Sequence, residues 1–368
     1  MSPISFIITN YTITNLISQM NTCVYLDSET CRWQLDQTRA SVGRFTDINQ
    51  FINNTGKKKI AIFHIPYPYN MEFEQRVELI LDTCDSIIIL CSELHEQTVD
   101  FIIRYDHPKL NYFICGFLNW TPTHSQINQW LDWFITTSYV YKHNTILDQL
   151  TPFQQKDKYF DILLGQPKLH RSFIYNKIIN LKLTNQVVMT YLQDFNKTLQ
   201  QQDTTGWQWE MPGLNLPNLE FKWTVTPVKY YGHNMSLSQV IPFDIYNQTA
   251  YSIVAETKFD NYYTFYTEKT VKPILAKRLF IVFAGQYHLS NLRKLGFKTF
   301  NGIIDESYDN VEDQTLRFNL AMEQVQYLIC QPQDQIFREI ESIVLHNQKL
   351  MLSTNWMECL NKEFNKLI

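Results

Sequence analysis

The chain has 368 residues, of which 45% are hydrophobic and 18% charged, and its formal net charge is −4. This composition excludes an intrinsically disordered chain, and the length exceeds what one hydrophobic core usually supports, so we expect two domains. This net charge gives no general attraction to nucleic acid or to an anionic membrane, although it does not exclude a local basic groove.

The N-terminal half alternates strand and helix patterns. We predict strands at 4–9, 59–64, 86–91 and 111–116, helices at 71–81 and 93–103, an irregular stretch from about 10 to 56, and a helical, aromatic stretch at 127–141. Strands that alternate with helices in this way predict right-handed βαβ units and a parallel sheet. The polar run 154–158 has no apolar period, so we place a domain boundary there.

The second half repeats the alternation. We predict strands at 160–164, 186–191, 250–256 and 279–284, helices at 170–180, 271–277 and 289–295, a long excursion from about 200 to 231, and amphipathic helices at 314–329 and 336–364. The predicted fold is therefore α/β, with an N-terminal domain over 1–153, a C-terminal domain over 154–335 and C-terminal helices over 336–368. Two such domains are expected to bind a ligand between the carboxyl ends of their sheets.

Features that are absent from the sequence also narrow the choices. No apolar run is long enough to cross a bilayer, and the first residues lack the basic segment of a signal peptide, so we expect a cytoplasmic protein with no membrane span. The 7 cysteines include no C-x-x-C pair, which argues against a disulfide framework and a zinc site. We expect buried free thiols at Cys84, Cys91 and Cys115.

The segment 265–285 is the most informative part of the chain. It reads as a polar turn, a short helix and a buried strand that ends in Gly285. Pro273 favours a first helical turn, so we expect the regular helix to start near Thr270. Lys269 would then oppose the helix dipole by about 0.3–1 kcal/mol unless an anion lies beside it. It indicates either an anion site or a solvated or salt-bridged lysine.

Arg171 has a position that mirrors that of Lys269. It opens the helix after strand 160–164, at the carboxyl edge of the second predicted sheet. A guanidinium and an ammonium that converge there can hold one doubly charged diphosphate. The alternative is a structural ion pair between Arg171 and a carboxylate such as Glu256 or Asp161.

Further candidates lie next to these two residues. Lys168 and His170 are secondary anion ligands, and Glu256 and Glu268 are candidates for hydrogen bonds to ribose or sugar hydroxyls, Glu256 equally well as an ordinary strand-end carboxylate. An aromatic group either stacks on a base or belongs to the core, and its members are Tyr262, Tyr263, Phe265 and Tyr266.

The sequence contains neither a glycine fingerprint for dinucleotides nor a Walker A loop, and only 10 glycines in all. Side chains and helix ends must therefore hold any phosphate. No D-x-D pair occurs in the sequence, so a diphosphate bridged by a metal ion is not supported. Cationic side chains would then have to stabilise the charge of the leaving phosphate. We expect no metal and no cofactor.

A catalytic base is expected from the N-terminal domain. His64 ends the strand 59–64 and Glu93 follows the strand 86–91, so both lie at the carboxyl edge of the first predicted sheet. The alternative for each is an ordinary loop or helix-end residue.

The stretch Ala255-Glu256-Thr257, the run Phe265 to Lys269 and the strand that ends in Gly285 together resemble the donor-site region of α1,3-fucosyltransferases and related phage and viral glycosyltransferase-like proteins. The turn from Gly165 to Arg171 is similar to a basic turn of those proteins. The resemblance covers about 160–308. Ala255-Glu256-Thr257-Lys258 and Val271-Lys272-Pro273 depart from the family pattern, so the sugar stays unassigned.

This resemblance implies a GT-B fold, in which two Rossmann-like domains face each other and the second holds a nucleotide sugar. It implies an inverting, metal-independent transfer, with Arg171 and Lys269 on the diphosphate, Glu268 on the ribose and Thr267 in the same donor site. The expected donor is a nucleoside-diphosphate sugar.

Three functions stay open at this point. The first is a glycosyltransferase whose acceptor is a glycan, a lipid-linked sugar or a hydroxylated DNA base. The second is a non-catalytic module that recognises a nucleotide or a partner protein on the same fold. The third, a dinucleotide-dependent oxidoreductase, lacks its glycine fingerprint.

Overall fold

The computed structural model describes residues 22–26, 44–45, 47–54, 58–65, 69, 71–142, 145–165, 168–191, 214–215 and 227–365. The fold is α/β with parallel sheets, and the chain forms two compact units, Met1–Asp132 with Asn355–Ile368 and Trp133–Thr354. The first unit thus ends before the boundary predicted at 153, and the predicted part 336–368 is divided between the two units. The predicted strand at 4–9 and most of the excursion at 200–231 lie outside the described residues.

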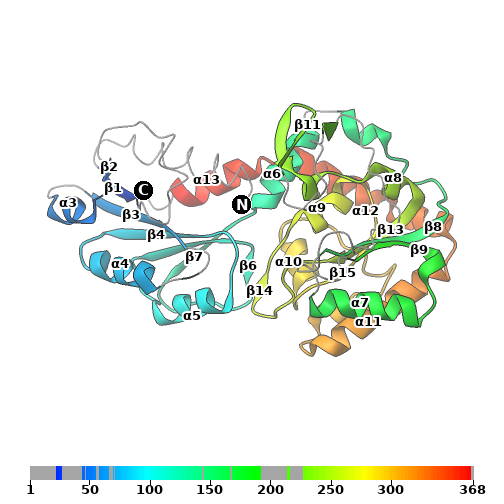
Figure 1. Ribbon diagram of the computed structural model, residues 1–368, viewed down its shortest axis with the longest axis horizontal. Helices are drawn as coiled ribbons and strands as arrows, with labels where there is room; N and C mark the ends of the chain where they lie inside the picture. Colours follow the sequence, from blue (N-terminus) through cyan, green and yellow to red (C-terminus); the bar gives the residue numbers. More distant parts are fainter. Residues whose placement is uncertain are drawn as a thin grey trace, which may run out of the picture. The chain divides into compact units, whose positions relative to one another are not determined.

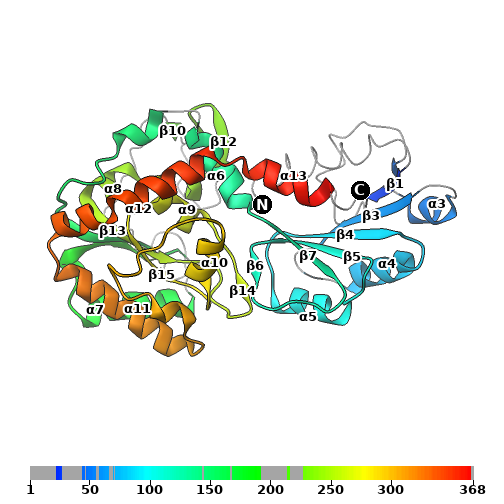
Figure 2. The same ribbon diagram turned by 180° about the vertical axis from the view of Figure 1, so that it is seen from behind.

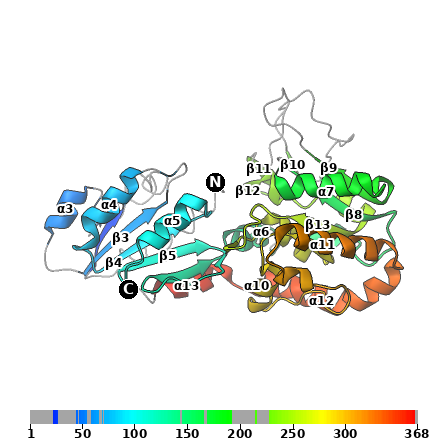
Figure 3. The ribbon, with the colours of Figure 1, turned by 90° about the horizontal axis from the view of Figure 1, so that it is seen from below.

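The first unit is built on a parallel sheet with the order β2-β1-β3-β4-β5-β7. Its strands are β1 (Thr22–Leu26), β2 (Arg44–Phe45), β3 (Lys58–His64), β4 (Ser86–Cys91), β5 (Leu110–Cys115) and β7 (Gln126–Trp130), and a short β6 spans Phe117–Leu118. Its helices are α3 (Ile48–Asn53), α4 (Met71–Leu81), α5 (Glu96–Arg104) and α13 (Trp356–Asn365). Helices α4 and α5 cover one face of the sheet and α13 the other (Figures 1 and 3). The predicted strand–helix alternation is confirmed here.

Two predictions in this unit were wrong. The stretch 127–141 is not one helix, because β7 precedes α6 (Asp132–Lys142). In β7 the buried Asn128 and Trp130 alternate with exposed or half-buried residues, the period of two that a strand requires. The stretch 10–56 was expected to be irregular, yet β1 lies in it and pairs with β3 along its whole length.

The second unit contains a parallel sheet with the order β15-β13-β8-β9. Its strands are β8 (Lys158–Leu163), β9 (Val187–Thr190), β13 (Thr249–Ala255) and β15 (Phe280–Phe283), with β14 at Tyr263–Thr264. A separate antiparallel sheet is made of β10 (Leu214–Asn215), β11 (Pro227–Tyr230) and β12 (His233–Ser236). The strands β13 and β15 are wholly buried and form the core, whereas the edge strand β9 is mostly half-buried.

Helices cover both faces of the four-stranded sheet. They are α7 (Leu169–Asn180), α8 (Phe243–Gln248), α9 (Glu268–Leu275), α10 (His288–Lys294), α11 (Gln314–Ile329) and α12 (Gln333–Ser353). Figures 1 and 2 show α7 and α11 on one face and α8, α9 and α12 on the other. The predicted helix at 336–364 is therefore two helices, of which α12 packs on α9 and α13 belongs to the first unit.

Gly285 follows β15 where another loop passes very close to it. A Cβ at this position would lie 2.1 Å from the Asp260 carbonyl oxygen, whereas a Cβ on Gly165 would lie 3.4 Å from its nearest neighbour, Nη1 of Arg171. We expect Gly285→Ala to lower the free energy of unfolding by about 1–3 kcal/mol, because backbone must move to admit the methyl group. Gly165→Ala, the matched control, should cost clearly less in urea unfolding. Equal losses in the two variants would contradict this account of Gly285.

Candidate functional site

Helix α9 begins at the carboxyl edge of the sheet, and a buried carboxylate holds its first turn in place. Thr267 is the N-cap, and its side-chain oxygen accepts a hydrogen bond from the Lys269 amide. Glu256, fully buried at the end of β13, accepts from Thr267 N and Oγ1, from Thr270 Oγ1 and from the Thr257 amide. Both carboxylate oxygens of Glu256 are therefore engaged within the chain.

The helix starts earlier than predicted. Its first residue is Glu268 rather than one near Thr270, and Pro273 lies inside the helix instead of in the first turn. The threonine cap decides the start, because a side-chain acceptor satisfies an amide that would otherwise lack a partner. Glu268 then lies in the first turn, where a carboxylate is favoured by the helix dipole.

Two lysines meet around Thr257, the residue that follows Glu256. Lys168 Nζ donates to the Thr257 carbonyl oxygen at 2.7 Å, and Lys269 Nζ lies 3.3 Å from Thr257 Oγ1. Lys269 also forms an ion pair with Glu268, with 2.6 Å between Nζ and Oε1. Lys269 is thus salt-bridged, as one of the two sequence interpretations proposed, and it lies beside a second ammonium group.

Arg171, in the first turn of α7, belongs to the same group of charges. Burial lowers the pKa of Arg171, and the carboxylates of Glu268 and Glu256 oppose that shift. Arg171 is 5% exposed, and its Nη1 lies over Gly165, the second residue after β8. Glu268 acts electrostatically on Arg171 and forms an ion pair with Lys269, so the two cations have one carboxylate in common, and their convergence on a diphosphate stays a prediction.

Lys272 is a cation of this site that the sequence analysis missed. It is 8% exposed and lies one helical turn after Glu268, so the two side chains share a face of α9. Burial lowers the pKa of Lys272 to about 8, and the Glu268 carboxylate opposes the shift. Burial alone would raise the pKa of Glu268, but Lys269 and Lys272 outweigh it and hold that pKa below its ordinary value.

We call these four residues the cation cluster; they are Lys168, Arg171, Lys269 and Lys272. Two carboxylates, Glu256 and Glu268, accompany the cluster, and a third, Asp161, acts on Lys272 but is neutralised by its ion pair with Arg278; this leaves an excess of two positive charges at the carboxyl edge of β8 and β13. Since buried like charges repel strongly, such an excess favours binding of an anion with two negative charges. A planar guanidinium beside ammonium groups suits phosphate oxygens.

His170 uses its ring nitrogen to bind the backbone beside the site rather than an anion. Its Nε2 lies 2.7 Å from the Glu256 carbonyl oxygen, so Nε2 carries the proton and donates it. Burial, together with Arg171, Lys168 and Lys269, lowers the pKa of His170 to about 3. The ring is therefore neutral at pH 7 and ties α7 to β13.

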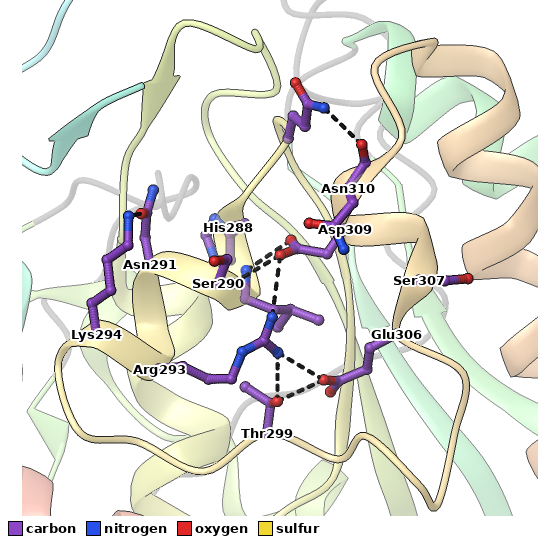
Figure 4. Close-up of polar contacts among 12 residues, drawn as sticks. His288, Ser290, Asn291, Arg293, Lys294, Thr299, Glu306, Ser307, Asp309 and Asn310 are labelled. Atoms are coloured by element: carbon purple, nitrogen blue, oxygen red, sulfur yellow. Dashed lines mark hydrogen bonds and ion pairs between the residues drawn. The ribbon is translucent and has the colours of Figure 1, made fainter. Parts of the chain in front are cut away.

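The helix end that follows Gly285 is occupied by the chain itself. Asp309 accepts hydrogen bonds at 2.8 Å from the amides of Leu289 and Ser290 at the start of α10. Figure 4 shows its carboxylate between this helix end and Arg293, which also contacts Glu306. The anion-binding end of α10 is filled by a side chain, so the cation cluster is the better candidate for an external phosphate.

The predicted aromatic group divides into core and edge. Tyr263, Phe265 and Tyr266 are almost fully buried, and only Tyr262 is half-buried. Tyr263 and Phe265 stack on each other, and the Tyr266 hydroxyl donates to the His288 carbonyl. For these three residues the core interpretation holds.

In the first unit, the predicted bases lie at the carboxyl edge of the sheet. His64 ends β3, is buried, and its Nε2 lies 2.8 Å from Oγ of Ser92, which follows β4. Glu93, the next residue, is half-buried and acts electrostatically on Cys115. Both side chains therefore lie at the edge that the sequence predicted.

Burial lowers the pKa of His64 to about 4, well below the ordinary value of 6.5. Below pH 6.5 the unfolded chain takes up a proton that the folded chain excludes, so the free energy of unfolding falls as the pH falls towards 4. We expect a loss of up to about 1.4 kcal/mol per pH unit from this group. Urea unfolding at pH 7 and pH 5 should show a smaller fall for His64→Gln than for the wild type, and an unchanged fall would contradict the buried, neutral histidine.

Other features of the described residues do not compete with this site. Among them, no group of three or more His, Cys, Asp or Glu side chains is placed to hold a metal ion, and no helix is long and apolar enough to cross a bilayer.

A cavity of about 450 Å³ lies at the loop 301–305, beside Gln324 and Tyr327, and no residue of the cation cluster lines it. The cysteines at 84, 91 and 115 are buried free thiols, as predicted.

No protein-family model matches this chain, and no curated protein matches its sequence.

Proposed function

We propose that this protein is an inverting, metal-independent glycosyltransferase that transfers a sugar from a nucleoside-diphosphate sugar to an acceptor hydroxyl. The observation that carries the proposal is the excess of two positive charges in the cation cluster, at the carboxyl edge of a parallel sheet. Ligands of open α/β sheets bind at that edge, and a diphosphate matches the charge. The resemblance of 160–308 to fucosyltransferase-like proteins points to the same donor.

In the proposed reaction, a base takes the proton of the acceptor hydroxyl, and the hydroxyl oxygen attacks the anomeric carbon. The bond from that carbon to the diphosphate oxygen breaks, and the nucleoside diphosphate leaves with the electron pair. Arg171, Lys269 and Lys272 stabilise the charge that develops on it. Glu268 binds the ribose, while Glu256 and Thr267 hold the start of α9 in position.

The base is proposed to come from the first unit, in a GT-B arrangement of two Rossmann-like domains. His64 and Glu93 lie at the carboxyl edge of its sheet, where such a base is needed. His64 is neutral at pH 7, since its pKa is about 4, and so has a lone pair to accept a proton. Glu93 is the alternative base if the imidazole serves only to orient Ser92.

A second candidate is a non-catalytic module that binds a nucleotide or a partner protein. Its support is the low pKa of His64, which makes this imidazole a weak base. Turnover decides between the candidates. Slow hydrolysis of any sugar nucleotide to the diphosphate would favour the enzyme, and tight binding without turnover would favour the module.

The proposed acceptor is a glycan or a modified DNA base, and the proposed location is the cytoplasm. The two acceptors differ in their dependence on salt, because binding to duplex DNA releases counterions. A gel shift on duplex DNA that weakens steeply as salt increases would favour the DNA base.

The proposal is tested by a thermal-shift screen of the full chain with nucleoside diphosphates and sugar nucleotides. A ligand at about 100 times its Kd stabilises the native state by about 2.7 kcal/mol, which raises the melting temperature measurably. We expect nucleoside diphosphates to stabilise the protein far more than nucleosides do. A screen in which no phosphate-bearing ligand raises the melting temperature would remove the basis of the proposal.

A further inference from the structure

Two tyrosines lie together beside the cation cluster and have no part in the function proposed so far. Tyr175 is on α7, and Tyr191 follows β9, the edge strand of the four-stranded sheet. Their rings stack with centroids 4.6 Å apart and 22° between the ring planes. The pair therefore joins helix α7 to the residue that follows the edge strand β9.

This pair differs in exposure from the tyrosines that form the core of the second unit. Tyr175 and Tyr191 are both half-buried, whereas the large, fully buried tyrosines of the unit belong to the core; these are Tyr141, Tyr230, Tyr251, Tyr263, Tyr266 and Tyr308. A stacked pair in the core would bury both rings. Here part of the aromatic surface stays in water, although aromatic side chains gain most of their stability from burial.

The pair is held in a fixed position. The hydroxyls of Tyr191 and Ser172 lie 2.7 Å apart, and Ser172 is the neighbour of Arg171 in the first turn of α7. The stack and this hydrogen bond together restrict the ring of Tyr191. A binding surface that is ordered in advance loses less entropy when a ligand arrives.

The distance from the pair to the cation cluster is short. Arg171 and Tyr175 are four residues apart on α7, so they share one face of the helix and are separated by about 6 Å along its axis. Tyr191 is near enough to Arg171 to act on it electrostatically. In a nucleoside diphosphate, the ribose fills a gap of this kind between the phosphates and the base.

We propose that Tyr175 and Tyr191 form the stacking platform for the nucleobase of the donor. This inference rests on the proposed function, because it takes the diphosphate to lie on the cation cluster. Stacking accepts any base, since every base has a π face. The platform therefore recognises a nucleoside diphosphate as a class and supplies affinity that the phosphates alone do not supply.

The test compares a ligand that has a base with one that has none. Calorimetric titrations of the full chain with a nucleoside diphosphate and with inorganic pyrophosphate are made for the wild type, Tyr191→Ala, Tyr191→Phe and Tyr327→Ala. Tyr327 is 44% exposed on α11, lines the cavity at 301–305, which no residue of the cation cluster lines, and serves as the matched control. Melting temperatures verify that each variant is folded.

We expect Tyr191→Ala to bind the nucleoside diphosphate about tenfold or more weakly and pyrophosphate unchanged, because only the base loses a contact. Tyr191→Phe keeps the ring and should stay within a few-fold of the wild type. The proposed platform would be contradicted if Tyr191→Ala weakened the binding of both ligands equally or of neither. It would also be contradicted if Tyr327→Ala lost as much affinity for the nucleoside diphosphate as Tyr191→Ala.

The same experiment separates this inference from the proposed function. If the wild type binds pyrophosphate and the nucleoside diphosphate equally well, the base contributes nothing to affinity. This result would contradict the stacking platform and would leave the proposed anion site unaffected. If the wild type binds neither, both proposals fail together.

Discussion

Replacing Lys269 with alanine is expected to reduce sugar transfer by about two to three orders of magnitude, the usual cost of losing one group that stabilises charge on a leaving group. Lys269 lies at the N-terminus of α9 and forms an ion pair with Glu268. Its removal takes away a positive charge where the diphosphate leaves, and frees a buried carboxylate that repels it. Steady-state rates with the sugar nucleotide that the screen identifies measure the effect.

Folding should be largely unaffected by this change, because Lys272 and Arg171 remain as counter-charges to Glu268, the Lys269 side chain is 22% exposed and the helix keeps its threonine cap. Lys298→Ala, at an exposed lysine of the same unit, is the control and should keep its activity. Lys269→Arg should recover part of the rate, since the charge is retained. Wild-type turnover by Lys269→Ala would contradict the role assigned to the cluster.

The largest effect on stability is expected at Arg278, which lies just before β15 and is 3% exposed. Its guanidinium forms an ion pair with Asp161 at 2.8 Å and donates to Ser252 Oγ and to the carbonyls of Tyr246, Thr249 and Tyr251. Arg278→Met leaves the Asp161 carboxylate buried without its counter-charge. We expect the free energy of unfolding to fall by about 3–5 kcal/mol in urea denaturation.

A double variant separates the unpaired charge from the other lost contacts. Arg278→Met with Asp161→Leu removes both members of the ion pair, and replacement of a whole buried pair by apolar groups is often close to neutral. We expect the double variant to regain part of the loss, but not all of it, because three backbone carbonyls still lose their donor. A double variant that is less stable than Arg278→Met would show that Asp161 is not destabilised by the loss of Arg278.

The sequence predicted the buried strands well. The strands β4 and β15 consist almost wholly of apolar residues, and β3, β8 and β13 each contain a buried apolar stretch, the pattern of strands in a parallel sheet that is covered on both faces. The errors fall where the local pattern is ambiguous. In β7, five residues run directly into the aromatic helix α6, and a short alternation is hard to separate from a helical period.

The site was predicted in part. Lys269 and Arg171 were found because each opens a helix after a strand, which fixes its edge of the sheet. Lys272 was missed because a lysine inside a helix usually faces water, and only packing decides that this one faces Glu268. The hydrogen bonds from Thr267 and Thr270 to Glu256 also depend on where α9 begins. Pro273 led to a predicted start that is too late in the chain.

We propose that Arg171 and Lys269 hold one diphosphate between them. A crystal structure of the protein with a bound nucleoside diphosphate tests it most directly. We predict phosphate oxygens about 2.7–2.9 Å from the Arg171 guanidinium and from Lys269 Nζ, the distances of charge-assisted hydrogen bonds. A diphosphate bound elsewhere, with these two side chains still directed to Glu268 and Glu256, would contradict the account.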